Sequence, residues 1–156
     1  MLLWYVGFSV FIVATIFKSS GIDYRLVALG SLLPLIVDLG FGYRAYGYTL
    51  LFAVVLLAVT MIGTIGRPRL LRRRLLCVPI GVFCGLVLSG AFTNDELFWW
   101  PFLGGSFAHD ALLPATWVVV VEEIVGLALC WFLVGQYDLY LPGPRREFLR
   151  TGRLRT

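Results

Sequence analysis

The sequence predicts an all-α protein, a polytopic transmembrane bundle of about five helices. Of its 156 residues, 60% are apolar and only 14% are charged, and the mean hydropathy is +0.89. Soluble domains carry about 25% charged residues, and a soluble chain of this length has too little interior for so much apolar surface. The composition therefore excludes an ordinary soluble domain and favours a protein solvated by lipid.

The apolar residues fall into runs that approach the length of about 20 residues needed to span a membrane. These runs are Leu2–Phe17, Tyr24–Gly42, Tyr46–Ile65, Leu75–Thr93 and Pro114–Val134. The second run contains Pro34, which removes a backbone hydrogen bond, and its apolar part stops at Asp38. We therefore expect this segment to be kinked or partly re-entrant. The first run lacks a basic leading region and a cleavage site, so it is expected to be a retained span.

The basic residues predict an orientation. Most of them lie in two blocks, Arg67–Arg74 and Arg145–Arg155, which two apolar runs separate. Cytoplasmic loops are enriched in arginine and lysine, so both blocks are expected on the cytoplasmic side of a multi-pass protein of the cell (inner) membrane. The N-terminus and the loop 92–113 then lie outside, and the C-terminus lies in the cytoplasm.

The predicted organisation is a transmembrane helical domain, residues 1–141, followed by a basic cytoplasmic tail, residues 142–156. The tail could lie on the inner leaflet or remain disordered. Arginines that flank apolar runs favour membrane lipids with anionic headgroups as partners, and they do not favour nucleic acid.

Ionisable groups inside a membrane are costly, so each one requires an explanation. Asp38 ends the second run, Arg44 follows it, and Glu122 and Glu123 interrupt the fifth run. Because neighbouring helical residues diverge by about 100°, only one glutamate can face a given site, and the sequence leaves open which one. We predict an outward-facing polar cluster that also includes Tyr48, Thr49 and His109.

Two interpretations of this cluster stay open. It can form a polar pocket for a cation, a proton or a lipid headgroup. Alternatively, Arg44 pairs with Asp38 or with a glutamate and holds the bundle together. No metal site and no cofactor is predicted, because the chain has one histidine and none of its three cysteines forms a C-x-x-C pair.

Four segments, in order, resemble a known family. They are Leu32–Asp38, Tyr43–Thr49, Gly85–Ser89 and Phe98–Phe102. Together they resemble the membrane-bound metal-dependent hydrolases of the YdjM type, the LexA-regulated inner-membrane family. That family carries an acidic L-P-D motif at the end of a span, an H-R-G-x-T-H-S-like motif, a helical H-x-x-x-D and a W-P-F-like segment.

The chain departs from this pattern at nearly every metal-ligand position that the resemblance implies. Leu35 stands in place of the first acid, Tyr43 and Tyr48 in place of histidines, and Gly85 and Ser89 in place of the H-x-x-x-D pair. The resemblance therefore implies a hydrolase-like scaffold that has lost most of its metal ligands. Arg44, Thr49 and Asp38 match the family pattern and carry over only as candidate pocket residues, and Ser89 is a further pocket candidate.

Three functional hypotheses follow. The leading one is a non-catalytic structural, lipid-binding or complex-subunit role, in which small residues such as Gly81, Gly85 and Gly90 allow close contact with a partner membrane protein or a second copy. The second is a hydrolase of envelope lipid or glycan that uses Asp38 and Glu122 as acid and base. The third is a small proton- or cation-coupled carrier.

Overall fold

The protein is all-α, as the sequence predicts. The computed structural model describes residues 1–17, 21–103 and 111–154, and within these ranges it contains no strand beyond one isolated bridge between Tyr43 and Ala111. The longer helices are α1 (Leu2–Phe17), α2 (Tyr24–Asp38), α3 (Leu50–Gly63), α5 (Cys77–Leu88) and α7 (Thr116–Gln136). The shorter ones are η1 (Tyr46–Tyr48), α4 (Arg69–Leu75), η2 (Ala91–Thr93), α6 (Asp95–Phe98) and α8 (Pro142–Thr151).

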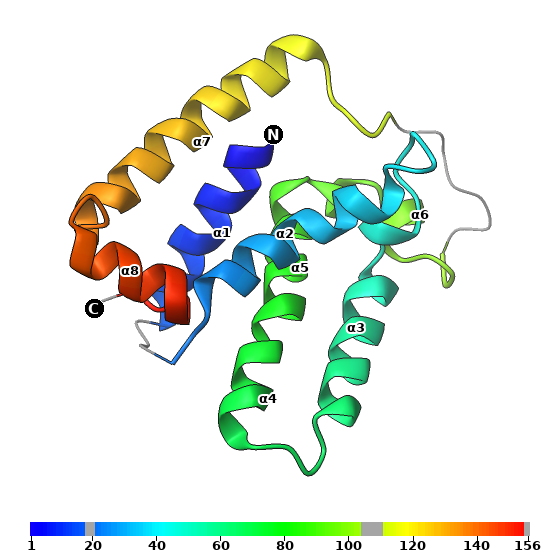
Figure 1. Cartoon of the computed structure of the whole chain (residues 1–156). Helices are drawn as coiled ribbons and strands as arrows, with labels where there is room; N and C mark the ends of the chain where they lie inside the picture. Colours follow the sequence, from blue (N-terminus) through cyan, green and yellow to red (C-terminus); the bar gives the residue numbers. More distant parts are fainter. Residues whose placement is uncertain (18–20, 104–110, 155–156) are drawn as a thin grey trace.

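Helix α2 runs through the middle of the molecule and connects its two halves (Figure 1). It packs against α5 on one side and against α1 on the other. Helix α1 also packs along α7, and α5 packs against α3. The loop after α2 and the segment η2–α6 lie at one end of α2, whereas α8 lies near its other end (Figure 1).

Small residues allow the central helices to approach closely. A β-carbon on Gly30 of α2 would overlap the Val78 carbonyl of α5, and one on Gly85 would lie 2.5 Å from the Ser31 carbonyl oxygen. In the same way, Gly126 of α7 faces the backbone of α1 at Trp4. Contacts of this kind are typical of helices packed in membranes, where apolar burial provides no drive for association. Gly85 therefore serves a contact inside the chain.

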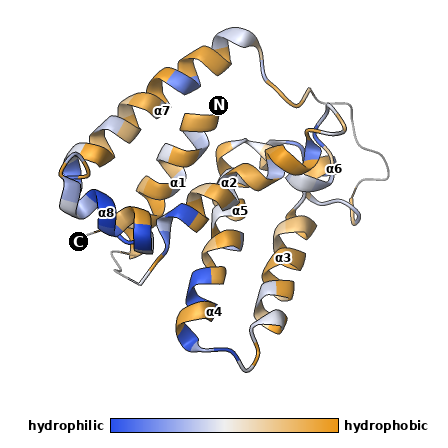
Figure 2. Ribbon diagram, in the orientation of Figure 1, coloured by the Kyte–Doolittle hydropathy of each residue, from blue (hydrophilic) through white to orange (hydrophobic). Residues whose placement is uncertain are grey.

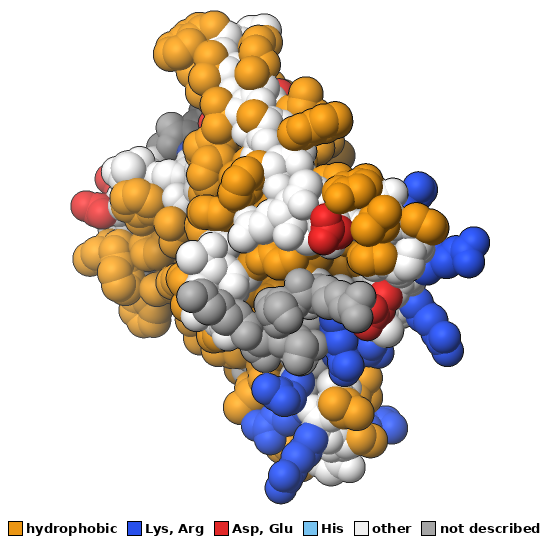
Figure 3. Space-filling model, turned by 90° about the vertical axis from the view of Figure 1, so that its left-hand side faces the viewer, with side chains coloured by type: hydrophobic (Ala, Val, Ile, Leu, Met, Phe, Trp, Pro, Cys, Tyr) orange, Lys and Arg blue, Asp and Glu red, His pale blue; other side chains and the backbone are white. Residues whose placement is uncertain are grey.

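The outer surfaces of the helices are apolar. On α7, Trp117 is 71% exposed and Trp131 is 80% exposed, and valines and leucines fill the turns between them. Most residues of α3 are also apolar, whereas the hydrophilic residues gather at α4, α8 and the start of α2 (Figure 2). Soluble monomers rarely expose apolar patches of this extent. Figure 3 shows the same division, with Arg side chains gathered at the margins of a largely apolar face.

Among the described residues, α7 is the one helix long and apolar enough to cross a membrane alone, and it is a candidate by length and composition only. Helix length therefore does not support the predicted set of about five spans. Helix α1 has the predicted bounds, Leu2–Phe17, and the other three runs form helices shorter than predicted. The hydroxyl oxygen of Thr49 accepts a hydrogen bond from Phe52 N and starts α3 at Leu50. Pro79 has no N–H to donate to the Leu75 carbonyl, and the helix is broken at Leu76, between α4 and α5. By contrast, α2 continues through Pro34.

The C-terminal helix α8 docks against the start of α2. It ends at Gly152, whose φ of 71° is left-handed, and the Gly152 carbonyl accepts a hydrogen bond of 2.9 Å from Tyr24 N. Arg25 donates to the Leu149 carbonyl at 2.7 Å. Leu154 is buried among residues of α1, α2 and α5. The sequence left open whether the tail lies on the inner leaflet or is disordered. Residues 142–154 are ordered, because they form α8 and pack against α2.

Candidate functional site

The centre of the site is Asp38, the last residue of α2, whose side chain is fully buried. Its two carboxylate oxygens accept hydrogen bonds from Ala45 N at 2.5 Å and Gly47 N at 2.9 Å. Position 47 requires glycine, because a β-carbon there would lie 2.6 Å from the Pro34 carbonyl oxygen. Asp38 thus closes the loop between α2 and α3 by holding its backbone.

Arg44 lies on this loop and stacks on an aromatic ring. Its guanidinium carbon is 5.3 Å from the ring centroid of Tyr48, a cation–π distance. The ion pairs among the described residues join Asp23 or Glu123 to cations, and none of them involves Arg44. One of the two interpretations from the sequence paired Arg44 with Asp38 or with a glutamate. The described residues do not contain that ion pair.

The two adjacent glutamates of α7 have different surroundings. Glu123 forms an ion pair with the amino group of Met1 and accepts a hydrogen bond from Leu3 N at 3.3 Å. Glu122 lies close enough to Tyr5 and Tyr48 for its charge to act on both hydroxyls. The glutamate that belongs to the cluster is therefore Glu122.

Three buried polar atoms of the cluster lack a well-formed hydrogen bond to the described part of the chain. They are the Nε of Arg44, the hydroxyl of Tyr48 and one carboxylate oxygen of Glu122. The Tyr48 hydroxyl approaches that of Tyr5, but the contact does not satisfy it. A buried polar group without a partner costs about 1–3 kcal/mol. The three atoms supply a donor, a donor-acceptor and an acceptor, so a small polar group or ordered water is the natural occupant.

The other predicted site residues have local roles or lie elsewhere. The Thr49 hydroxyl donates to the Tyr46 carbonyl at 2.8 Å and caps α3. The Ser89 hydroxyl donates to the Leu86 carbonyl at 2.8 Å. Gly85 has no side chain and lies where α2 and α5 cross. Neither position of the implied H-x-x-x-D pair, Gly85 or Ser89, therefore offers a metal ligand. His109 lies outside the described residues.

No group of three or more histidine, cysteine or acidic side chains among the described residues could hold a metal ion. The aromatic segment of the resemblance does lie near the loop, since the rings of Tyr46 and Trp100 are 5.4 Å apart and perpendicular. Asp38 also binds the backbone of Ala45 and Gly47, so three of the four resembling segments, Leu32–Asp38, Tyr43–Thr49 and Phe98–Phe102, meet in space.

Sequence reasoning missed one residue of the cluster, Tyr5, and one buried ion-pair residue outside it, Asp23. Tyr5 is buried and joins the cluster from α1, but it stands in an apolar run where a tyrosine gives no distinct signal. Asp23 is buried beside α8 and pairs with Arg25 at 3.3 Å and with Arg74 at 3.9 Å. The spacing of Asp23 and Arg25 is the signal that could have revealed it.

No family model matches the chain, and neither a curated protein nor a solved structure matches it significantly. The YdjM-type resemblance therefore depends on the order of its four segments and stays a prediction.

Proposed function

We propose that the protein is a multi-pass membrane protein with its N-terminus outside, its arginine blocks in the cytoplasm and a non-catalytic binding site near the outer face. The membrane part of the proposal is supported by the exposed apolar surfaces of α3 and α7. Helices shorter than a bilayer still reach its interior when they pack as a bundle and local thinning accommodates them. The glycine contacts between α2 and α5 support the same environment.

The orientation is supported by where the basic segments lie. The start of α2, α4 and α8 share one end of the molecule, and contacts of Arg74 link them: its Nε lies 3.9 Å from a carboxylate oxygen of Asp23, and it donates to the Thr151 carbonyl at 3.3 Å. Such an end matches the cytoplasmic side of a membrane. The site around Asp38 and Tyr48 then faces the outer leaflet.

The single observation that carries the non-catalytic role is the use of Asp38. Both of its oxygens accept hydrogen bonds from backbone amides of the loop and its side chain is fully buried, so Asp38 cannot reach a substrate or a metal without opening the loop. Catalytic bases must reach the proton that they abstract. The unpartnered atoms of Arg44, Tyr48 and Glu122 instead suit the recognition of a polar headgroup or of a polar side chain on a partner helix.

Three experiments test the proposal. Reporter fusions after residues 45, 70 and 156 test the orientation, and we expect the first to be extracytoplasmic and the other two cytoplasmic. Fusions after 70 and 156 on opposite faces would refute it. Resistance of the chain to alkaline extraction from membranes tests membrane insertion directly.

The third experiment separates binding from catalysis. Envelope lipid and glycan profiles are compared between a deletion strain, the wild type and the variants Asp38→Asn and Glu122→Gln, each first checked for accumulation in the membrane. A non-catalytic role predicts that both accumulated variants keep the wild-type profile. A hydrolase predicts that both reproduce the deletion profile, and that result would overturn the proposal.

A further inference from the structure

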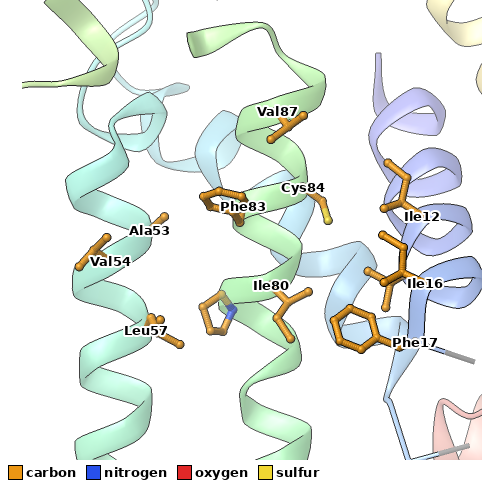
Figure 4. A pocket seen from close by; sticks show the side chains of 12 residues that line it. Ile12, Ile16, Phe17, Ala53, Val54, Leu57, Ile80, Phe83, Cys84 and Val87 are labelled. Atoms are coloured by element: carbon orange, nitrogen blue, oxygen red, sulfur yellow. The ribbon is translucent and has the colours of Figure 1, made fainter. Parts of the chain in front are cut away.

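An apolar groove of about 520 Å³ opens between α1, α3 and α5. Figure 4 shows α5 between α3 and α1, with Ile16 and Phe17 of α1 on one side and Val54 and Leu57 of α3 on the other. The volume is within the range of about 300–1,000 Å³ that is typical of ligand pockets.

The groove arises from the two faces of α5. Gly81 and Gly85 fix one face against α2, so the opposite face, which carries Ile80, Phe83 and Val87, points away from the central helix. From Pro79 to Val87 this face rises by about 12 Å. One leaflet of the hydrocarbon core is about 15 Å thick, so the groove matches the length of chain that a lipid inserts into one leaflet.

Two exposed arginines flank the end of the groove nearest α4. Arg72 reaches α3, where its guanidinium lies 3.4 Å from the sulfur of Met61, one helical turn beyond Leu57 of the groove wall. Arg73 reaches the other side, with its guanidinium against Gly21, just past the end of α1. Both side chains are exposed.

Among the described residues, the acid that forms ion pairs at this end of the molecule is Asp23, and it does not neutralise these two arginines. Asp23 is buried, and it is occupied by Arg25 and Arg74. No acid within the described ranges forms an ion pair with Arg72 or Arg73, so the apolar groove ends at two positive charges. This arrangement complements a long apolar chain that ends in an anionic headgroup.

We propose that the groove holds an acyl chain of an anionic phospholipid of the inner leaflet, with the headgroup phosphate bound by Arg72 and Arg73. The proposal rests on the membrane orientation given above. It assigns the lipid to a defined site, in addition to any diffuse attraction of the basic surface for anionic lipids.

The test uses the full chain reconstituted in vesicles of phosphatidylglycerol and phosphatidylethanolamine, then extracted in mild detergent, with retained lipid measured by native mass spectrometry. The headgroup variant Arg72→Gln/Arg73→Gln is matched by Arg145→Gln/Arg146→Gln, which removes the same charge from α8. The groove variant Val54→Trp is matched by Val55→Trp on the same helix. Val54 and Val55 are 51% and 49% exposed, but only Val54 lines the groove.

We expect the wild type to retain phosphatidylglycerol in preference to phosphatidylethanolamine. Since each arginine near a membrane surface contributes about 1 kcal/mol, the headgroup variant should bind at least about tenfold more weakly. Val54→Trp should lose the lipid, and both control variants should retain it.

Equal losses in the two arginine pairs would indicate diffuse attraction and overturn the defined site, as would full retention by Val54→Trp. A dimer that Val54→Trp dissociates would mean that a second copy covers the groove, and would also overturn the lipid assignment. Membrane-inserted protein without retained lipid would refute this inference alone. A chain that fails to insert would refute the proposed function as well.

Discussion

The carboxylate of Asp38 accepts a hydrogen bond from the amide of Gly47, nine residues later, at 2.9 Å. The same carboxylate accepts a second hydrogen bond, from Ala45 N. One buried side chain therefore holds the loop that carries Arg44 and Tyr48. A carboxylate that satisfies two backbone amides is difficult to replace, because each amide is left buried and unpaired without it.

We therefore expect Asp38→Ala to lower the free energy of unfolding by about 3 kcal/mol or more, since two charge-assisted hydrogen bonds are lost. Asp38→Asn retains one acceptor oxygen and should cost less. Unfolding in detergent, followed by tryptophan fluorescence, measures both. Glu96→Gln, at an exposed acid of α6, is the control. A stability of Asp38→Ala equal to that of this control would show that the loop does not depend on Asp38.

The crossing of α2 and α5 gives a second prediction. A β-carbon on Gly81 would overlap the Val27 carbonyl, which is backbone and cannot rotate away. Gly81→Ala should therefore separate the helices and destabilise the protein by about 1–3 kcal/mol, the usual cost of overpacking. Gly135→Ala is the matched control, because nothing lies within 4 Å of its added carbon. Thermal unfolding in detergent should give a lower midpoint only for Gly81→Ala.

The docking of α8 depends on Gly152. A side chain there would meet the Asp23 carboxylate, and its φ of 71° is strained for any other residue. We expect Gly152→Ala to release α8, so that trypsin cleaves at its arginines faster than in the wild type. Gly66→Ala carries the same kind of φ penalty, with a φ of 78°, but meets nothing within 4 Å. If both variants are cleaved at the same rate, the contact with Asp23 does not hold the helix.

The residues of the site were easier to predict from the sequence than their partners. An acid at the end of an apolar run needs compensation, so Asp38 was identifiable from its position alone. Its partners were not identifiable. The backbone amides reach Asp38, and Arg44 stacks on Tyr48, only because the loop folds back onto Pro34. Hydropathy patterns contain no information about such a closure.

Which of the two glutamates faces the cluster could not be predicted for a similar reason. Their divergence on the helix was predictable, but the rotation of α7 is fixed by the contact of Gly126 with α1, more than a hundred residues away. Helix lengths were overestimated for a different reason. Thr49 and Pro79 are local signals that end or start helices, and they stand inside apolar runs whose hydropathy continues past them. Lipid solvates both regular and irregular apolar segments, so composition alone does not locate the helix ends.

The last prediction separates the adjacent glutamates by stability. Glu122 has a buried oxygen without a partner in the described chain, so neutralising it removes a desolvation cost. Glu122→Gln should therefore leave the protein equally stable or more stable, by up to about 1 kcal/mol, when no ligand is bound. Glu123→Gln removes the ion pair with the Met1 amine. Because the Glu123 side chain is 39% exposed, this loss should lower the free energy of unfolding by less than about 1 kcal/mol. The unfolding midpoints of the two variants are compared in the same detergent. The midpoint of Glu122→Gln should stay at the wild-type value or rise, and that of Glu123→Gln should fall slightly. Strong destabilisation by Glu122→Gln would mean that its carboxylate is already satisfied, and that the cluster is a structural network with no free atoms for a ligand.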